Sequence, residues 1–157
     1  MNRWRRKYLQ AGGRATLLGL LGATGWLKPG DAQAQTWNGA AFETHSLGDA
    51  LKALSASEAA PSKDIVFLQT PEIAENGAVV PIGVTSGIPN TEAIAILIEK
   101  NPNPLAAVFD IPAGTEATIS TRVKMAQTSS IYALVRAGGK YYIAAKEVKV
   151  TLGGCGG

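Results

Sequence analysis

The residue best suited to chemistry in this sequence is Cys155, which lies between two glycine pairs, Gly153-Gly154 and Gly156-Gly157. No adjacent side chain shields its sulfur, and glycine gives the surrounding backbone the greatest conformational freedom. If a strand ends at Leu152, three residues of extended chain would place the Cys155 Cα about 10 Å beyond the sheet. We therefore predict a flexible arm over residues 153–157 that can carry the thiol into a narrow channel of another protein.

Cys155 is the only cysteine and His45 the only histidine in the chain, which excludes an internal disulfide and a Cys/His metal site. No Lys, Arg or His lies beside the thiol to stabilise a thiolate, the nearest base in sequence being Lys149. Activation must then come from a partner's site. A free thiol in an oxidising compartment invites intermolecular disulfides, which argues that it has a function. These features predict a substrate carrier and not an enzyme, with no catalytic residue, metal or cofactor of its own.

The remaining polar residues do not suggest a catalytic site. His45 has no catalytic partner near it in sequence, and we interpret it as a surface residue. The segment 128–130 is interpreted as a polar turn. No phosphate-binding loop or nucleophile elbow is present. Solvated carboxylates, none paired as acid and base, are expected near strand ends and turns at Asp64, Glu72, Glu75, Glu92 and Glu116.

Residues 1–34 have the pattern of a cleaved export signal: a basic start, an apolar run of 13 residues at 15–27, and a small-x-small site that predicts cleavage after Ala34. The apolar run is shorter than the ~20 residues of a membrane-spanning helix. Arg5-Arg6, followed by Lys7-Tyr8-Leu9, resembles the twin-arginine signal, which exports folded proteins. An ordinary Sec signal that happens to contain two arginines is the alternative. We expect a periplasmic mature protein that does not remain in the membrane.

The charge of the mature part argues against nucleic-acid binding. The whole chain has a formal charge of +3, but the leader holds six of the 15 Lys and Arg residues and one of the 12 Asp and Glu residues. Nine basic and 11 acidic side chains remain, a formal charge of −2. A near-neutral domain with few aromatic residues has neither the basic surface nor the stacking platform that nucleic acid requires.

The first part of the mature chain, residues 35–63, is expected to contain a flexible lead-in up to Thr44 and one short helix. Leu47, Ala50 and Leu51 recur at helical spacing, and Ser46 before them can cap the helix. Asp49 suits the positive end of a helix dipole.

Residues 64–152 alternate with a period of two and contain frequent turn signals, which predicts seven or eight short antiparallel strands. Asn76-Gly77 and Gly138-Gly139 each suggest a hairpin, and Pro81 suggests an edge or a bulge. Residues 93–98 are apolar on both faces, so their strand should be central. The expected fold is an all-β, immunoglobulin-like antiparallel β-sandwich with a short N-terminal helix and a flexible glycine-rich C-terminal arm.

The twin-arginine leader, the segment Pro-Glu-Ile-Ala-Glu-Asn-Gly-Ala-Val-Val-Pro-Ile at 71–82 and the terminal Gly-Gly-Cys-Gly-Gly together resemble the SoxY family of the bacterial sulfur-oxidising (Sox) system. The resemblance implies a periplasmic immunoglobulin-like subunit that pairs with SoxZ and carries sulfur intermediates on Cys155. It further implies that the haem enzyme SoxAX couples thiosulfate to the cysteine as an S-thiosulfonate and that the dimanganese hydrolase SoxB releases sulfate. Where SoxCD is present, it would oxidise the remaining sulfane sulfur.

Two other readings remain open at the level of the sequence. A terminal Gly156-Gly157 also resembles ubiquitin-like sulfur carriers, whose carboxylate becomes a thiocarboxylate. That chemistry needs cytoplasmic ATP, whereas this chain has a predicted export signal, and its strand-rich order lacks the long central helix of the ubiquitin-like fold. Alternatively, Cys155 could link two copies of a structural sandwich through a disulfide.

Overall fold

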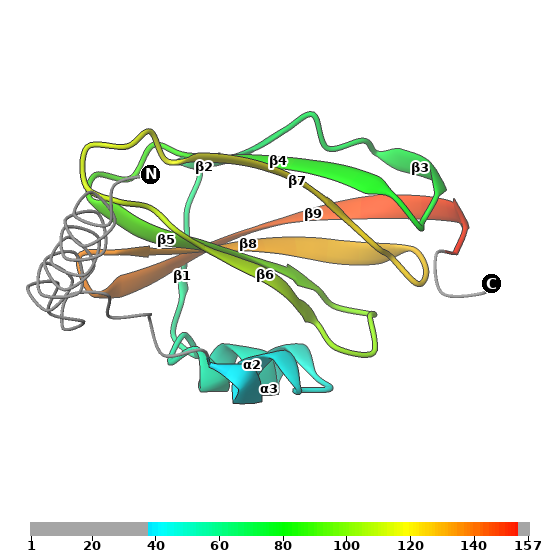
Figure 1. Cartoon of the computed structure of the whole chain (residues 1–157), viewed down its shortest axis with the longest axis horizontal. Coiled ribbons are helices and arrows are strands. Elements are labelled where there is room, and N and C mark those ends of the chain that lie inside the picture. The colour runs from blue at the N-terminus through cyan, green and yellow to red at the C-terminus, as the bar shows by residue number, and fades with distance from the viewer. Residues whose placement is uncertain (1–37, 154–157) are drawn as a thin grey trace, which may run out of the picture. The chain divides into compact units, whose positions relative to one another are not determined.

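The computed structural model describes residues 38–153, which form three layers: a small sheet, a large sheet and a pair of short helices (Figure 1). In chain order the elements are α2 (Gly39–Phe42), α3 (Leu47–Ala53), β1 (Ala60–Pro61), β2 (Ile65–Leu68), β3 (Ile73–Asn76), β4 (Val80–Ser86), β5 (Thr91–Ile98), β6 (Leu105–Asp110), β7 (Thr118–Val123), β8 (Ser129–Ala137) and β9 (Lys140–Leu152). The predicted all-β, immunoglobulin-like sandwich is confirmed.

The large sheet has the order β1-β9-β8-β5-β6, and the small sheet has the order β2-β4-β7. β5 lies between β8 and β6, as its apolar residues on both faces predicted. Pro81 lies where β4 extends past the end of β2, so only β7 pairs with that part of β4. The expected edge position of this proline is confirmed.

The two faces of β5 contribute to two separate hydrophobic clusters. One face carries Ile94, Ile96 and Ile98, all fully buried, and packs against the small sheet. The other face carries Ala95 and Leu97 and packs against the two helices. Since both clusters share this strand, burying apolar area on both sides ties the three layers into one unit.

Helix α3 begins as predicted, because the Ser46 side chain accepts a hydrogen bond from the Asp49 amide at 3.1 Å. The expected flexible lead-in up to Thr44 was wrong for Gly39–Phe42, which forms helix α2. The Asn38 side chain caps α2, and Ala41 is fully buried. The longest helix among the described residues, α3, has seven residues, so the long central helix of a ubiquitin-like fold is not found there.

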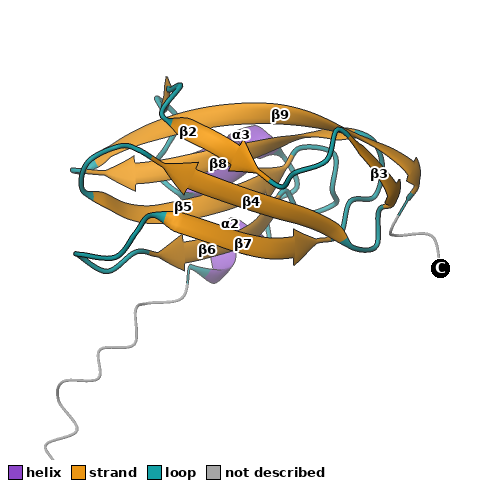
Figure 2. Cartoon of the chain, turned by 90° about the horizontal axis from the view of Figure 1, so that it is seen from above, coloured by secondary structure: helices purple, strands orange, loops and turns teal. Residues whose placement is uncertain are grey.

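Gly138 and Gly139 form the predicted hairpin turn between β8 and β9, with φ angles of 56° and 73° that favour glycine. The chain after this hairpin is not divided into short strands as expected. β9 is instead one strand of 13 residues that runs along the sandwich (Figure 2). Lys146 lies in the middle of this strand and donates to the Thr70 carbonyl at 2.6 Å.

The hairpin predicted at Asn76-Gly77 is wrong. β3 does not pair with β4. It pairs in parallel with the end of β9, and the turn after β3 takes the chain across to the small sheet. The Asn76 side chain accepts from the Ala78 amide at 2.8 Å, so the turn itself forms as its residues favour. A local turn signal does not specify which strands become neighbours.

β1 is the second strand that pairs in parallel with β9. The prediction of antiparallel strands also missed this pairing.

Candidate functional site at the base of the C-terminal arm

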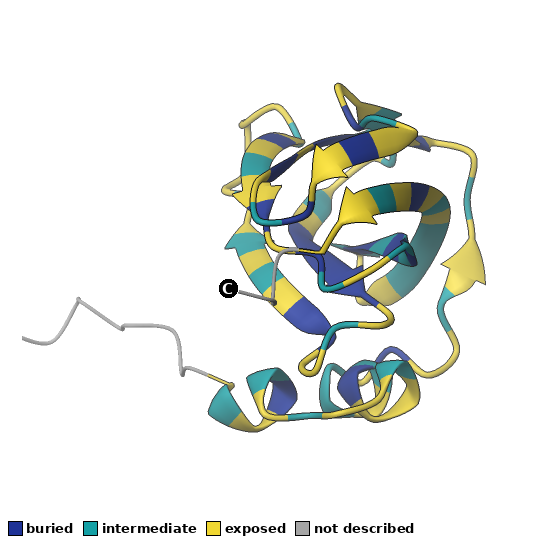
Figure 3. Ribbon diagram, turned by 90° about the vertical axis from the view of Figure 1, so that its right-hand side faces the viewer, coloured by how far each residue is buried: buried dark blue, intermediate teal, exposed yellow. Residues whose placement is uncertain are grey.

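Most of the predicted site lies outside the described residues. This holds for Cys155 with Gly154, Gly156 and Gly157, and for the leader residues Arg5, Arg6 and Ala34. Gly153 is the last described residue. The candidate site that the structure places is therefore the base of the arm, where β9 ends and the carrier segment begins. Figure 3 looks onto this end of the sandwich.

The end of β9 is held along one side by β3. Asn76 is the register partner of Leu152, and the Gly77 amide, one residue further on, donates to the Leu152 carbonyl at 2.7 Å. The Thr151 hydroxyl also donates to the Glu75 carbonyl at 2.8 Å. The last residues before the arm are therefore fixed by main-chain pairing and by one side-chain hydrogen bond.

The other side of the β9 end is held by a side chain. β8 begins at Ser129, the register partner of Val148, so β9 extends past it. There the Thr128 hydroxyl accepts from the Val150 amide at 3.0 Å. The hydroxyl replaces a strand neighbour and satisfies an amide that would otherwise lack its partner.

Gly77 connects this strand end to the segment that precedes β8. It is buried, and its carbonyl accepts from the Met125 amide at 2.7 Å while its amide bonds Leu152. Met125 itself is fully buried in the core. One peptide segment thus links the end of β9 to a residue anchored between the two sheets.

Gly153 packs closely against Ala126, and a Cβ added to Gly153 would overlap the Ala126 carbonyl oxygen. Asn101 holds Ala126 in place: its carboxamide accepts from the Ala126 amide at 3.0 Å and donates to the Lys124 carbonyl at 2.8 Å. The role of Gly153 at the described end of the arm is therefore close approach of two backbones, in addition to the flexibility expected from its sequence.

The loop that carries Asn101 is in turn bonded to the start of β8. The Ser129 hydroxyl accepts from the Lys100 amide at 3.0 Å, and the Ser130 carbonyl accepts from the Glu99 amide at 3.1 Å. The interpretation of 128–130 as a simple polar turn was wrong, since Ser129 is buried and begins a strand. We call the segments 76–77, 99–101 and 124–128 together the arm clamp.

Sequence reasoning missed the clamp residues Asn101 and Thr128, and Ser129 beside them at the start of β8. Asparagine next to proline and a run of hydroxyl residues are ordinary loop signals, and they carried no indication of these contacts. What distinguishes them is that each side chain bonds a backbone amide of a segment distant in sequence.

The other candidate residues do not converge on a catalytic arrangement. The exposed His45 has its Nδ1 atom 3.1 Å from the Pro102 carbonyl oxygen. Glu92 forms an ion pair with Arg136 at 3.0 Å, and Glu116 accepts from the Thr118 hydroxyl at 3.0 Å. In residues 38–153 no three His, Cys, Asp or Glu side chains gather as metal ligands would. No helix in this part of the chain is long and apolar enough to cross a membrane.

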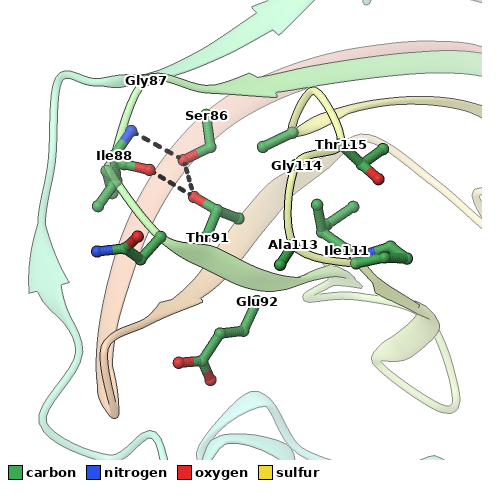
Figure 4. A pocket seen from close by; sticks show the side chains of 12 residues that line it. Ser86, Gly87, Ile88, Thr91, Glu92, Ile111, Ala113, Gly114 and Thr115 are labelled. Carbon is green, nitrogen blue, oxygen red and sulfur yellow. Dashed lines mark hydrogen bonds between the residues drawn. The ribbon is translucent and has the colours of Figure 1, made fainter.

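A cavity of about 390 Å³ lies at the opposite end of the sandwich, where β4 ends and β5 and β7 begin (Figure 4). Its hydroxyl groups bond one another and the local backbone: Ser86 Oγ lies 2.9 Å from Thr91 Oγ1, and Thr91 donates to the Ile88 carbonyl at 2.8 Å. These groups stabilise the turn after β4. The cavity shares no lining residue with the arm clamp.

Comparisons with known proteins bear on the family of this chain. Residues 51–155, a range that ends at Cys155, match the family described as sulfur oxidation protein SoxY. The sulfur carrier protein SoxY from Chlorobium limicola f thiosulfatophilum is 41% identical, with a TM-score of 0.61 over 68% of this chain and 97% of that chain.

Other comparisons are weaker. A superoxide reductase (neelaredoxin) from Ignicoccus hospitalis is 18% identical, covers 62% of this chain and 86% of that chain, and has a TM-score of 0.49, which supports no functional argument. A search of curated protein sequences gave no match. The family match spans most of the chain and the SoxY structure aligns over nearly its whole length, so this chain belongs to the SoxY family of sulfur oxidation proteins.

Proposed function

We propose that the mature protein is a periplasmic carrier, exported by the twin-arginine route, that holds thiosulfate-derived sulfur covalently on Cys155. The observation that carries this proposal is the family match, which extends to the single cysteine of the chain. The arm clamp supports it, because Gly77 and Thr128 hydrogen-bond the end of β9 and Ala126, which Asn101 holds, packs against Gly153.

The first proposed step joins thiosulfate to the thiol. The Cys155 S–H loses its proton, a bond forms between Sγ and the outer sulfur of thiosulfate, and two electrons pass to a partner of the SoxAX type, whose haems accept them. The product is a cysteine S-thiosulfonate. Oxidation and thiolate activation both belong to the partner, since no basic side chain adjoins Cys155 in sequence.

The second proposed step is hydrolysis by a SoxB-type partner. Water attacks the sulfonate sulfur, the S–S bond to that sulfur breaks, sulfate leaves, and a persulfide remains on Cys155. Where a SoxCD-type enzyme is present, it oxidises that sulfane sulfur. The carrier supplies no catalytic group to either step, and metals and haems belong to the partners.

The proposed functional unit is a heterodimer with a SoxZ-type β subunit that lacks a leader of its own. Export of a folded pair would explain why one partner carries a twin-arginine signal for both. Partner enzymes would bind this unit transiently, since ordering the arm on each visit costs about 1–2 kcal/mol per residue.

The deciding experiment measures the intact mass of the native protein from cells grown on thiosulfate and from cells grown without it. A thiosulfate adduct on Cys155, removed by a reducing agent, is expected only in the first sample. Cys155→Ser should lack the adduct and abolish thiosulfate-dependent electron transfer while it still folds and pairs. Retained activity in that variant, or an adduct lost with Gly156-Gly157 on C-terminal trimming, would contradict the carrier function.

A disulfide-linked structural dimer, the remaining alternative, makes a different prediction. Alkylation of Cys155 would then remove only the covalent dimer and leave sulfur oxidation intact.

A further inference from the structure

The large hydrophobic side chains that the described residues leave most exposed lie at the arm end of the sandwich. Among six such exposed side chains, the three most exposed are Leu152 at 71%, Ile73 at 59% and Val79 at 56%. These belong to the end of β9, to β3, and to the turn that follows β3. The other three, on β2 and β6, are exposed by 38–45%.

Leu152 directly precedes the arm segment, and Val79 lies in the turn that is hydrogen-bonded to Leu152. The Leu152 carbonyl accepts from the Gly77 amide, and the Val79 amide donates to the Asn76 carbonyl in the same turn at 3.4 Å. Ile73 is further away, since its register partner is Lys149, three residues before Leu152. We call Val79 and Leu152 the apolar rim.

The length of chain beyond Gly153 sets how near a partner must come. Two residues of extended chain carry the Cys155 Cα at most about 7 Å from the Gly153 Cα. An enzyme that reacts with this thiol in a recessed site must therefore bring the mouth of that site against the surface around Gly153. The apolar rim belongs to the surface that such a mouth would meet, because Leu152 directly precedes Gly153 and the turn of Val79 is bonded to Leu152.

We propose that the apolar rim is the docking surface for the enzyme that couples thiosulfate to Cys155, and that the mouth of this enzyme's channel is itself apolar. This inference rests on the proposed function. Val79 and Leu152 are exposed in the carrier and would be covered in the complex, so removal of their surface from water favours docking. Because the rim is small, binding stays weak enough for release after each reaction.

The test compares the double variant Val79→Thr/Leu152→Gln with Val66→Thr, a control on β2 whose side chain is 45% exposed. Loading of Cys155 is followed by intact mass, with thiosulfate and the thiosulfate-coupling enzyme of the same organism, over a range of carrier concentrations. The KM for the double variant should rise about tenfold, or about 1.4 kcal/mol. Its kcat, its thermal stability and its rate of alkylation by iodoacetamide should be unchanged, and the control should behave as the wild type.

Each other outcome contradicts the proposal in a distinguishable way. An unchanged KM, with the wild type loaded normally, would overturn the rim alone. Loss of binding to the second subunit in the double variant would assign the rim to that subunit instead. A free Gly-Gly-Cys-Gly-Gly peptide loaded as efficiently as the whole carrier would show that no body surface contributes. Failure of the enzyme to load wild-type Cys155 would overturn the proposed function, and the rim with it.

Discussion

The Gly77 amide donates to the Leu152 carbonyl at 2.7 Å, and this bond ties the turn between the two sheets to the last residue before the arm segment. The same glycine accepts from Met125, which is buried in the core. The starting point of the arm is therefore coupled to the packing of the sandwich, although the thiol itself lies beyond it.

A methyl group at Gly153 should loosen the arm base. In Gly153→Ala the added Cβ overlaps the Ala126 carbonyl, and we expect the end of β9 to detach from the clamp while the core stays intact. Amide hydrogen exchange at Gly77 should become at least about tenfold faster, with little change in the denaturation midpoint. Gly48→Ala is the control, because a Cβ at this helical position meets nothing within 4 Å. Unchanged exchange at Gly77 would show that the close approach to Ala126 is not needed.

Removing the Asn101 side chain should destabilise the clamp. Asn101→Ala leaves the partly buried Ala126 amide without its acceptor and should lower the free energy of unfolding by about 1–3 kcal/mol. Asn101→Asp retains an acceptor for Ala126 but loses the donor to Lys124, so a smaller loss is expected. Urea denaturation measures all of these variants.

Asn103→Ala is the control for the Asn101 series. It removes one exposed bond to the Thr44 carbonyl, at 3.3 Å, and should change stability by less than about 0.5 kcal/mol. Equal effects at the two asparagines would argue against a special role for Asn101.

The arm glycines beyond Gly153 should matter for partner access and not for reactivity. Gly154→Val and Gly156→Val widen and stiffen the segment beside Cys155, and we expect both to slow sulfur loading by a partner enzyme. Alkylation by a small reagent should change little, because such a reagent needs no channel. The two rates are measured on each variant. Equal loading rates in variant and wild type would remove the steric argument for glycine.

Substitutions in the core between the two sheets should destabilise the protein in proportion to the burial of the side chain. Ile96 is fully buried in the central strand β5, so Ile96→Ala should lower the free energy of unfolding by about 2–5 kcal/mol. Val66→Ala, at a 45% exposed position, should cost less than about 1 kcal/mol. A two-state urea transition gives both values, and comparable losses would contradict the assigned burial of the two positions.

Several elements were predictable because their signals are local. The cap of α3 depends on Ser46 and Asp49, three residues apart, and the β8–β9 turn depends on two adjacent glycines with positive φ. The central place of β5 followed from its composition, since a strand apolar on both faces is stable only when both are covered. Cys155 and its glycines likewise identified the predicted carrier segment from residue type and spacing alone.

The surroundings of the arm base were decided by tertiary structure. Asn76-Gly77 indicated a turn, but only the folded chain shows that β3 leaves β4 to pair in parallel with β9. Asn101 and Ala126 meet across 25 positions of sequence. No local pattern encodes such a contact, because it depends on how two sheets pack and on which loops that packing brings to one end. Residue type and spacing alone predict the chemistry of the arm, whereas the packing of the sandwich decides where the arm begins.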